Sequence, residues 1–253
     1  MIVLKNYITV LLIESIVILL LLNLNIQPMD NILSSLQIQV KEGLYLKNPE
    51  SSDLGKKIIT GSIDLIQKIG FEQFTFRKLA LHIKSTEASV YRYFEGKHQI
   101  LLYLSSWYWS WTEYRLVFAL ANIQSAKERL EIAIDLLTNQ IIVDQTYTHI
   151  DEAKLHDIVV SESTKAYLTK SVDEVNQVGA YSSYKRLVER VSQIILEINP
   201  DYKYPHMLVS TTIEGAHLQS YFAEHLPRLT NVVKGENSIK EFYKNIIFKS
   251  IQS

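Results

Sequence analysis

The sequence predicts an all-α fold, and three observations support this prediction. The chain of 253 residues has only eight glycines and five prolines, and no proline lies between residues 50 and 199. Apolar residues recur with the 3.6-residue period of a helix between Leu54 and Ile69. Ser125, Ser171 and Ser238 are each followed three residues later by glutamate, the spacing of a helix N-terminal capping box. Beyond the first three helices, we expect helices near 97–121, 126–143, 150–160, 162–170, 172–198, 206–226 and 238–251.

The first three helices are closely spaced, and the second and third are short. Asp53 is placed to cap a helix that Gly70 ends, because glycine readily adopts positive φ at a helix C-terminus. Thr75 is placed to cap a second helix and Thr86 a third, with a tight turn at 83–85 between them. Two short helices around such a turn are typical of a helix-turn-helix DNA-binding unit.

The third helix has the character of a helix that enters the DNA major groove. Val90 and Phe94 are spaced i and i+4 and form its inner face, which leaves small and polar side chains on its outer face. Residues 53–101 contain eight Lys and Arg against five Asp and Glu, a local charge of +3 in a chain whose net charge is −1. Positive charge is therefore concentrated where DNA would bind.

The run from Leu54 to about Leu102 resembles the DNA-binding domain of the TetR family of bacterial transcriptional regulators. The motif that carries the resemblance is spread over Thr75, Leu79-Ala80, the turn at 83–85, Thr86, Val90-Tyr91, Tyr93-Phe94 and Lys97. The chain departs from the pattern at Lys84, where the family usually has glycine. A non-glycine residue in a left-handed conformation costs about 1 kcal/mol, so we expect this turn to be wound differently.

The resemblance implies a set of DNA-binding residues. The resemblance implies phosphate contacts by Thr75, Tyr91, Tyr93 and Lys97. It places Thr86 at the start of the third helix, and it implies base contacts by Arg77, Glu87, Ala88, Ser89 and Arg92. The chemistry agrees, because hydroxyls and lysine donate to phosphate oxygens and arginine binds guanine bidentately. For Tyr93 the alternative is a core aromatic, and for Glu87 the alternative is stabilisation of the helix N-terminus.

The chain is accordingly divided into four parts. These are an apolar N-terminal segment (1–28), an N-terminal arm (29–52), a three-helix helix-turn-helix DNA-binding domain (53–101), and a larger helical ligand-binding and dimerisation domain (102–253). In the TetR family the last two helices commonly pair with those of a second copy. We therefore expect a homodimer through 206–226 and 238–251, using Leu208, Thr212, Gly215, Ala216, Gln219, Tyr221, Ile239, Phe242, Ile246 and Phe248.

An aromatic stripe follows Lys97 on the expected helix 97–121. It consists of Tyr103, Trp107, Trp111, Tyr114 and Phe118. One interpretation is a core that joins the DNA-binding helices to the rest of the protein. The other is that Trp107, Trp111 and Tyr114 line the pocket of a small-molecule effector, which would change the separation of the two DNA-binding units.

Signals for catalysis are weak. The chain has no cysteine, which excludes disulfides and thiol catalysis and suits a cytoplasmic protein. His149, Glu152 and His156 have helical spacing, and Glu214 with His217 has the Glu-x-x-His spacing of di-iron bundles. Both signals are weak, since a di-iron site also needs further glutamates, so we expect no metal, no cofactor and no enzymatic activity. Ser182 and Lys185 have Ser-x-x-Lys spacing without further support.

The N-terminus contains a strongly apolar stretch at 7–22. It is shorter than the roughly 20 residues needed to span a bilayer and includes Glu14. We favour translation from Met29 over a membrane anchor at 7–22. The arm that follows is expected to be flexible or partly helical, although Leu36, Ile38 and Val40 alternate as in a strand.

These observations predict a ligand-responsive transcriptional regulator, a repressor that binds double-stranded palindromic operator DNA as a homodimer. Repression is the usual mode of the family. The alternative is a helical small-molecule sensor, membrane-associated or soluble, whose DNA binding the unusual turn weakens. A helical metal-dependent enzyme is the third hypothesis, and metal analysis tests it.

Overall fold

The computed structural model describes residues 38, 40–139, 149–162, 164–233 and 235–252. Within these ranges every regular element is helical, which confirms the all-α prediction. None of the helices in the same ranges is both long enough and apolar enough to cross a membrane. The predictions for the apolar stretch 7–22 and for a start at Met29 lie outside the described residues.

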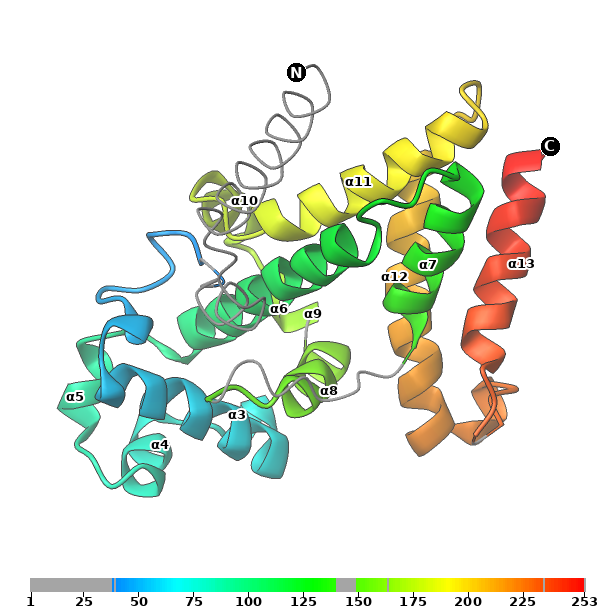
Figure 1. The fold of residues 1–253 in the computed structure, drawn as a ribbon. Helices are drawn as coiled ribbons and strands as arrows, with labels where there is room; N and C mark the ends of the chain where they lie inside the picture. The colour runs from blue at the N-terminus through cyan, green and yellow to red at the C-terminus, as the bar shows by residue number, and fades with distance from the viewer. Residues whose placement is uncertain (1–37, 39, 140–148, 163, 234, 253) are drawn as a thin grey trace, which may run out of the picture. The chain divides into compact units, whose positions relative to one another are not determined.

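The three N-terminal helices are α3 (Asp53–Gln73), α4 (Phe76–His82) and α5 (Glu87–Tyr91) (Figure 1). The cap of α3 is Ser52, whose hydroxyl accepts from the backbone N–H of Gly55 at 3.1 Å, so the predicted cap Asp53 is wrong by one position. Gly70 has φ 74° and ψ 157° and interrupts the helical backbone, as predicted. A last turn, including Phe71, continues beyond this kink.

The segment that precedes α3 packs on the DNA-binding domain and on the start of the central helix. Leu44 is buried, and the N–H of Leu46 donates to the carbonyl of Tyr93 at 2.8 Å. The ring of Tyr45 meets that of Tyr103 edge-on, and a short 3₁₀ helix, η1 (Pro49–Ser51), leads into α3. Of the two alternatives for the arm 29–52, flexible or partly helical, the described part from residue 40 onward agrees with the second, because it contains η1 and is anchored by apolar contacts and a backbone hydrogen bond.

The central helix is α6 (Lys97–Ala119), which contacts α3, α7, α8, α9 and α11. Every residue from Ile100 to Trp109 is buried, as expected for a helix surrounded by others. The predicted domain boundary between residues 101 and 102 falls inside α6. One continuous helix thus belongs both to the DNA-binding unit and to the rest of the protein.

The other helices form the larger part of the structure. They are α7 (Ala126–Thr138), α8 (Glu152–Glu162), α9 (Thr164–Tyr167), α10 (Val172–Gln177), α11 (Ser182–Ile198), α12 (Pro205–His225), the 3₁₀ helix η2 (Pro227–Leu229) and α13 (Ser238–Gln252) (Figure 1). The predicted helix 172–198 is two helices, because Gly179 adopts a φ of 83° between α10 and α11. The predicted end of the helix 126–143 lies beyond residue 139, outside the described residues.

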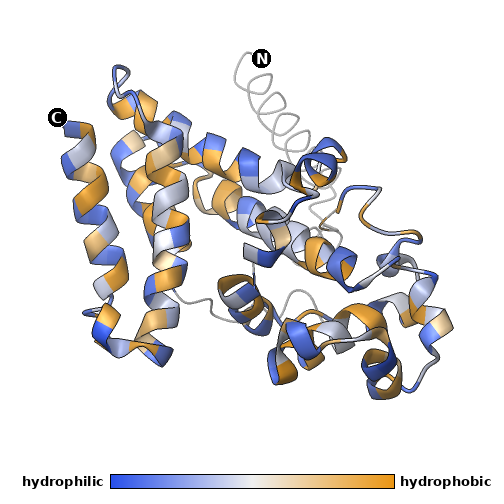
Figure 2. Ribbon diagram, turned by 180° about the vertical axis from the view of Figure 1, so that it is seen from behind, coloured by the Kyte–Doolittle hydropathy of each residue, from blue (hydrophilic) through white to orange (hydrophobic). Residues whose placement is uncertain are grey.

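The three predicted capping boxes differ in outcome. Ser125 accepts from the N–H of Glu128, as predicted. Ser171 precedes α10 but makes no capping hydrogen bond, and Ser238 is the first residue of α13 rather than its cap. The outer helices carry both polar and apolar residues (Figure 2), and α11 packs against α6, α7 and α12.

Candidate nucleic-acid interface

The helix pair α4 and α5 is held by buried apolar side chains. Leu79 and Ala80 of α4, with Val90 and Phe94 from α5 and the turn after it, are all at most 4% exposed. Both predicted caps are confirmed: Thr75 accepts from the N–H of Lys78, and Thr86 accepts from the N–H of Ser89, each at 3.2 Å. Caps and core together fix the orientation of α5 against α4.

The turn between the two helices has the hydrogen bonds of a Schellman motif. Ser85 N–H donates to the carbonyl of Ala80 at 2.8 Å, and Lys84 N–H donates to the carbonyl of Leu81 at 3.3 Å. Lys84 has a φ of 55°, the left-handed conformation that glycine adopts most easily. Our expectation of a differently wound turn is therefore wrong, because the two capping hydrogen bonds offset the strain of a lysine at this position.

Most of the predicted DNA-binding residues share the solvent-facing side of this unit. Those that are exposed are Thr75, Arg77, Thr86, Glu87, Ala88, Tyr91 and Arg92. Ser89 is half-buried, and its hydroxyl lies 2.8 Å from that of Thr86. The structure thus brings eight of the ten predicted residues to the surface of α4, α5 and their caps.

The cations on this surface are available for a ligand. Arg77 and Arg92 are exposed and form no ion pair with any residue that the structure describes. The ring of Tyr91 packs edge-on against Phe76, with ring centroids 4.8 Å apart, which holds its hydroxyl end toward solvent. Two unpaired guanidinium groups beside an exposed phenol are the chemistry that phosphates and guanine edges require.

Two predicted residues have structural contacts that the sequence pattern did not reveal. Tyr93 is 2% exposed and its hydroxyl lies 2.7 Å from that of Ser52, so its ring belongs to the core, the alternative stated above. The prediction that Tyr93 contacts a phosphate is therefore wrong, because the side chain does not reach the surface. Lys97 donates to the carbonyls of Phe71 and Glu72, at 3.1 Å each, and its ammonium lies over the Phe71 ring. It thereby braces the end of α3.

A polar seam joins α3 to α8 and to the residues just before α8. We call it the α3–α8 seam and define it by four pairs: Thr60 with the carbonyl of His149 (2.5 Å), Asp64 with Lys154 (2.7 Å), Gln67 with Asp157 (3.2 Å), and the N–H of Phe71 with Glu162 (3.1 Å). Thr60, Asp64 and Gln67 are spaced four and three residues apart and so occupy one face of α3. Sequence reasoning missed this seam, because about 90 residues separate the partners of each pair.

The aromatic stripe is mainly core. Trp107 and Trp111 are 2% and 1% exposed, and their rings stack with centroids 6.2 Å apart. Arg115 covers the outer face of Trp111 at 4.7 Å, and Tyr114 stacks on Phe118. The cavity among α3, α8 and α12 and the groove among α6, α7 and α11 contain none of the predicted pocket residues Trp107, Trp111 and Tyr114 in their described linings.

The histidines and glutamates whose spacing gave a weak metal signal contact other side chains. His149 pairs with Glu50, and His156 Nδ1 lies 2.9 Å from the hydroxyl of Tyr108. Glu214 accepts from Tyr167 and Tyr184, while His217 lies against the ring of Trp109. The described residues contain no group of three or more such side chains that would hold a metal ion.

The C-terminal helix pair presents apolar side chains to solvent. Met207 and Leu218 on α12 and Phe242 on α13 are 67%, 51% and 55% exposed. Of the predicted dimer residues, Phe242 is therefore exposed, whereas Thr212 and Ala216 are buried within the chain because they pack on neighbouring helices. Exposed apolar side chains on two adjacent helices are typical of a surface that a partner covers.

Comparison with known proteins agrees with this geometry. Residues 58–104 match the family model of the bacterial regulatory proteins of the tetR family. No curated protein sequence gives a significant match to the chain.

Several solved structures share the fold. The fatty acid degradation regulator FadR from Bacillus halodurans has a TM-score of 0.56 at 15% identity, covering 79% of this chain and 95% of its own. AibR, solved with isovaleryl coenzyme A and operator DNA, has a TM-score of 0.52 at 14% identity, covering 76% and 96%. The superantigen PfiT has a TM-score of 0.52 at 15% identity, covering 80% and 97%. At such identities the likeness concerns the fold alone.

Proposed function

Because this chain belongs to the TetR family of bacterial regulatory proteins through its DNA-binding domain, we propose that it is a ligand-responsive transcriptional repressor. It binds a palindromic operator as a homodimer in the cytoplasm. The observation that carries the proposal is the solvent-facing side of α5, where Arg92 lies beside small and polar side chains and pairs with no described residue. A helix with that surface fits the major groove, and arginine reads guanine there.

The DNA contacts divide by chemistry. Arg77, Ser89 and Arg92 supply donors for base edges, with Glu87 and Ala88 beside them on the same surface. Thr75, Thr86 and Tyr91 present hydroxyls for phosphates. Thr75 and Thr86 already cap helices, so their hydroxyls are held in fixed positions near the N-termini of α4 and α5. Helix N-termini favour anions, which supports phosphate binding at this surface.

A homodimer through α12 and α13 supplies the second DNA-binding unit. The support is that three apolar side chains of these two helices, Met207, Leu218 and Phe242, are exposed. Burying such side chains against a second copy is favourable, at about 25 cal/mol per Å². Twofold symmetry then presents two α5 helices to half-sites one DNA turn apart, about 34 Å. The local charge of +3 alone gives modest non-specific affinity, so paired half-sites supply the specificity.

Ligand response is supported by the α3–α8 seam. The scaffold helix of the DNA-binding domain, α3, is tied directly to α8 of the larger domain by side-chain hydrogen bonds and one ion pair. A ligand that favours a different placement of α8 therefore changes the placement of α4 and α5. AibR, which shares the fold, was solved with both a coenzyme A thioester and operator DNA.

The test is binding of the full chain to DNA from its own upstream region, measured by fluorescence anisotropy across a salt series. The key variant is Arg92→Lys, which keeps the charge but loses bidentate contact with guanine. We expect it to lower discrimination between operator and random DNA by about tenfold, for a loss of 1–3 kcal/mol per base contact. Lys203→Ala, an exposed lysine after α11, is the matched control and should bind as the wild type does.

The opposite outcome is also defined. If no specific complex forms with the upstream DNA, and a selection from genomic fragments also recovers no preferred sequence, the repressor proposal is wrong. The helical sensor then becomes the better description.

A further inference from the structure

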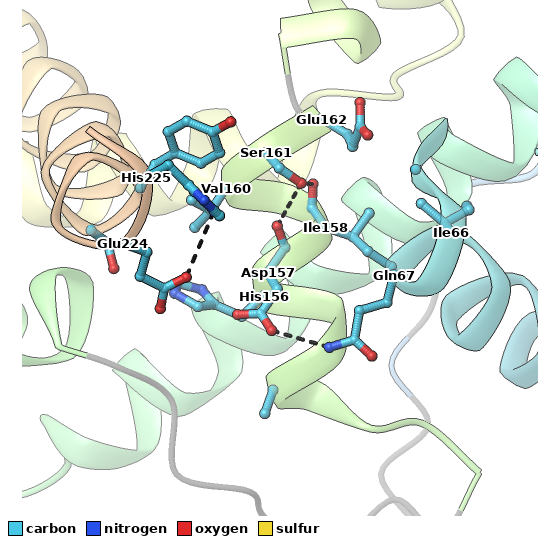
Figure 3. Close-up of a pocket in the computed structure, with 14 residues that line it drawn as sticks. Ile66, Gln67, His156, Asp157, Ile158, Val160, Ser161, Glu162, Glu224 and His225 are labelled. Atoms are coloured by element: carbon cyan, nitrogen blue, oxygen red, sulfur yellow. Dashed lines mark hydrogen bonds and ion pairs between the residues drawn. The ribbon is translucent and has the colours of Figure 1, made fainter. Parts of the chain in front are cut away.

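An open cavity lies where α3, α8 and α12 meet (Figure 3). Its volume of about 520 Å³ falls in the range of small-molecule sites. Ile66, Gln67 and Gly70 from α3 line one side, α8 contributes the floor, and the last two turns of α12 line the other side. The cavity therefore connects the scaffold of the DNA-binding domain to a helix of the proposed dimer surface.

The lining of this cavity is acidic. It includes the carboxylates of Asp157, Glu162 and Glu224, and the described lining residues include no lysine or arginine. Glu162 is compensated by Lys165 at 2.6 Å and by the N–H of Phe71. The other two carboxylates lack such compensation.

Asp157 and Glu224 have weak partners. Among the described residues, the side chain of Asp157 accepts only from the amide of Gln67, at 3.2 Å, and Glu224 has only the neighbouring His225, at 3.8 Å (Figure 3). Partial burial raises the pKa of Asp157, and the negative charges of Glu224 and Asp151 raise it further. Negative charge on Asp157 is thus held at a cost that a cation would remove.

Apolar and aromatic side chains complete the walls. Ile66 and Ile158 form apolar surface, and the rings of Tyr221 and His225 lie 4.5 Å apart on α12. His156 adds a third ring, and burial lowers its pKa to about 4, so it carries no positive charge at pH 7. Carboxylates beside aromatic faces suit a positively charged group attached to an apolar body.

We propose that this cavity is the effector site and that its effector is a small organic cation with an apolar or aromatic body. The inference rests on the proposed function above. The cation lies between Asp157 and Glu224, and its apolar part contacts Ile66, Ile158 and the ring of Tyr221.

Occupancy acts on the α3–α8 seam. A cation at Asp157 competes with the Gln67 amide for the carboxylate, and Gln67 is one member of the seam. Gly70, the kink of α3, also lines the cavity, and the residue after it is held by Glu162 and Lys97. Weakening this end of the seam allows the α3 kink, and with it α4, to move relative to α8. Operator DNA and the cation therefore favour different placements of the α3 kink and α4 relative to α8.

The experiment is calorimetric titration of the full chain with three named probes. Benzyltrimethylammonium and tetraphenylphosphonium are cations of two sizes, and tetraphenylborate is an anion with the shape of tetraphenylphosphonium. We expect at least one cation to bind and tetraphenylborate to bind at least tenfold more weakly than tetraphenylphosphonium. Asp157→Asn and Glu224→Gln keep shape but remove charge, and each should weaken cation binding by about fivefold, since both groups are partly solvated. Asp173→Asn, an exposed acid on α10, is the matched control and should change nothing.

The outcomes separate this proposal from the proposed function. If neither cation binds, or if both variants bind the cations as the wild type does, the cation site is wrong whether or not the protein binds DNA. Glu224 is 67% exposed, so Glu224→Gln remains informative if Asp157→Asn does not fold. Operator binding is measured on the same samples by anisotropy. Cation binding that leaves operator affinity unchanged overturns the coupling through the seam, whereas absence of any operator complex overturns the repressor proposal and leaves the calorimetry interpretable.

Discussion

The contact between α12 and α13 makes a sharp prediction at Gly215. A Cβ atom added at this position would lie 1.9 Å from the hydroxyl oxygen of Tyr243 and 3.0 Å from its ring carbon Cζ. Tyr243 is 7% exposed, so its ring has little room to withdraw. In an unobstructed helix, Gly→Ala stabilises by about 1 kcal/mol. Because the approach is so close, we expect overpacking of about 2–3 kcal/mol, which exceeds that gain.

The expected net effect of Gly215→Ala is a loss of about 1–2 kcal/mol, which lowers the melting temperature by about 2–8 °C for a chain of this size. Tyr243→Phe removes the hydroxyl that causes the closest approach. The double variant should therefore recover at least about 1 kcal/mol relative to Gly215→Ala alone, and the two changes should be strongly non-additive.

The assay is thermal and urea unfolding of the wild type, both single variants and the double variant, all at one protein concentration because a dimer stabilises by mass action. Sedimentation reports the oligomeric state of each. If Gly215→Ala alone is more stable than the wild type, then α13 does not pack on α12 as the structure has it, and the reasoning is refuted.

Three further predictions concern buried and bracing groups. Burial lowers the pKa of His217 to about 3, so this histidine stays neutral in the folded protein at pH 5 while the unfolded chain takes up a proton below about 6.5. This group alone should lower the stability by about 2 kcal/mol from pH 7 to pH 5, in addition to the loss from His156, and His217→Gln should lack that share in urea unfolding at the two pH values. An identical pH dependence in the variant would show that the side chain is solvated. Burial opposes the charge of Glu113, but hydrogen bonds from Arg186 and Arg190 outweigh it and hold the pKa of this carboxyl below its ordinary 4.5. The stabilisation by this carboxylate is therefore present above pH 4.5 and lost as the pH falls through the lowered value. Glu113→Gln should cost about 1–2 kcal/mol at pH 7, a figure discounted because both arginines are half exposed. The variant should also lose less stability in acid than the wild type does. Lys97→Met keeps the apolar stem over Phe71 but removes two hydrogen bonds, so unfolding should become easier by about 1 kcal/mol; unchanged stability would mean that Lys97 does not brace α3.

The helix-turn-helix unit was predictable because its signals are local. Thr75 and Thr86 cap helices through N–H groups three residues away, and the inward spacing of Val90 and Phe94 is set within one helical turn. The break at Gly70 follows equally from a property of that residue alone. Side-chain burial was less predictable, since the spacing that places Tyr93 in the motif does not reveal that its hydroxyl meets Ser52, 41 residues away.

The sequence by itself determined the helical class, the position of the DNA-binding unit and the solvent-facing side of α5, since these depend on interactions within a few turns of chain. Only the tertiary structure decided that α8 lies along α3, because Gln67 and Asp157 are 90 residues apart and either side chain alone reads as an ordinary solvated group. The same packing buries Trp107 and Trp111 and leaves the acidic cavity beside α3 instead. Local periodicity specifies which face of a helix is apolar, whereas the partner of that face is chosen by the free energy of the whole packed chain.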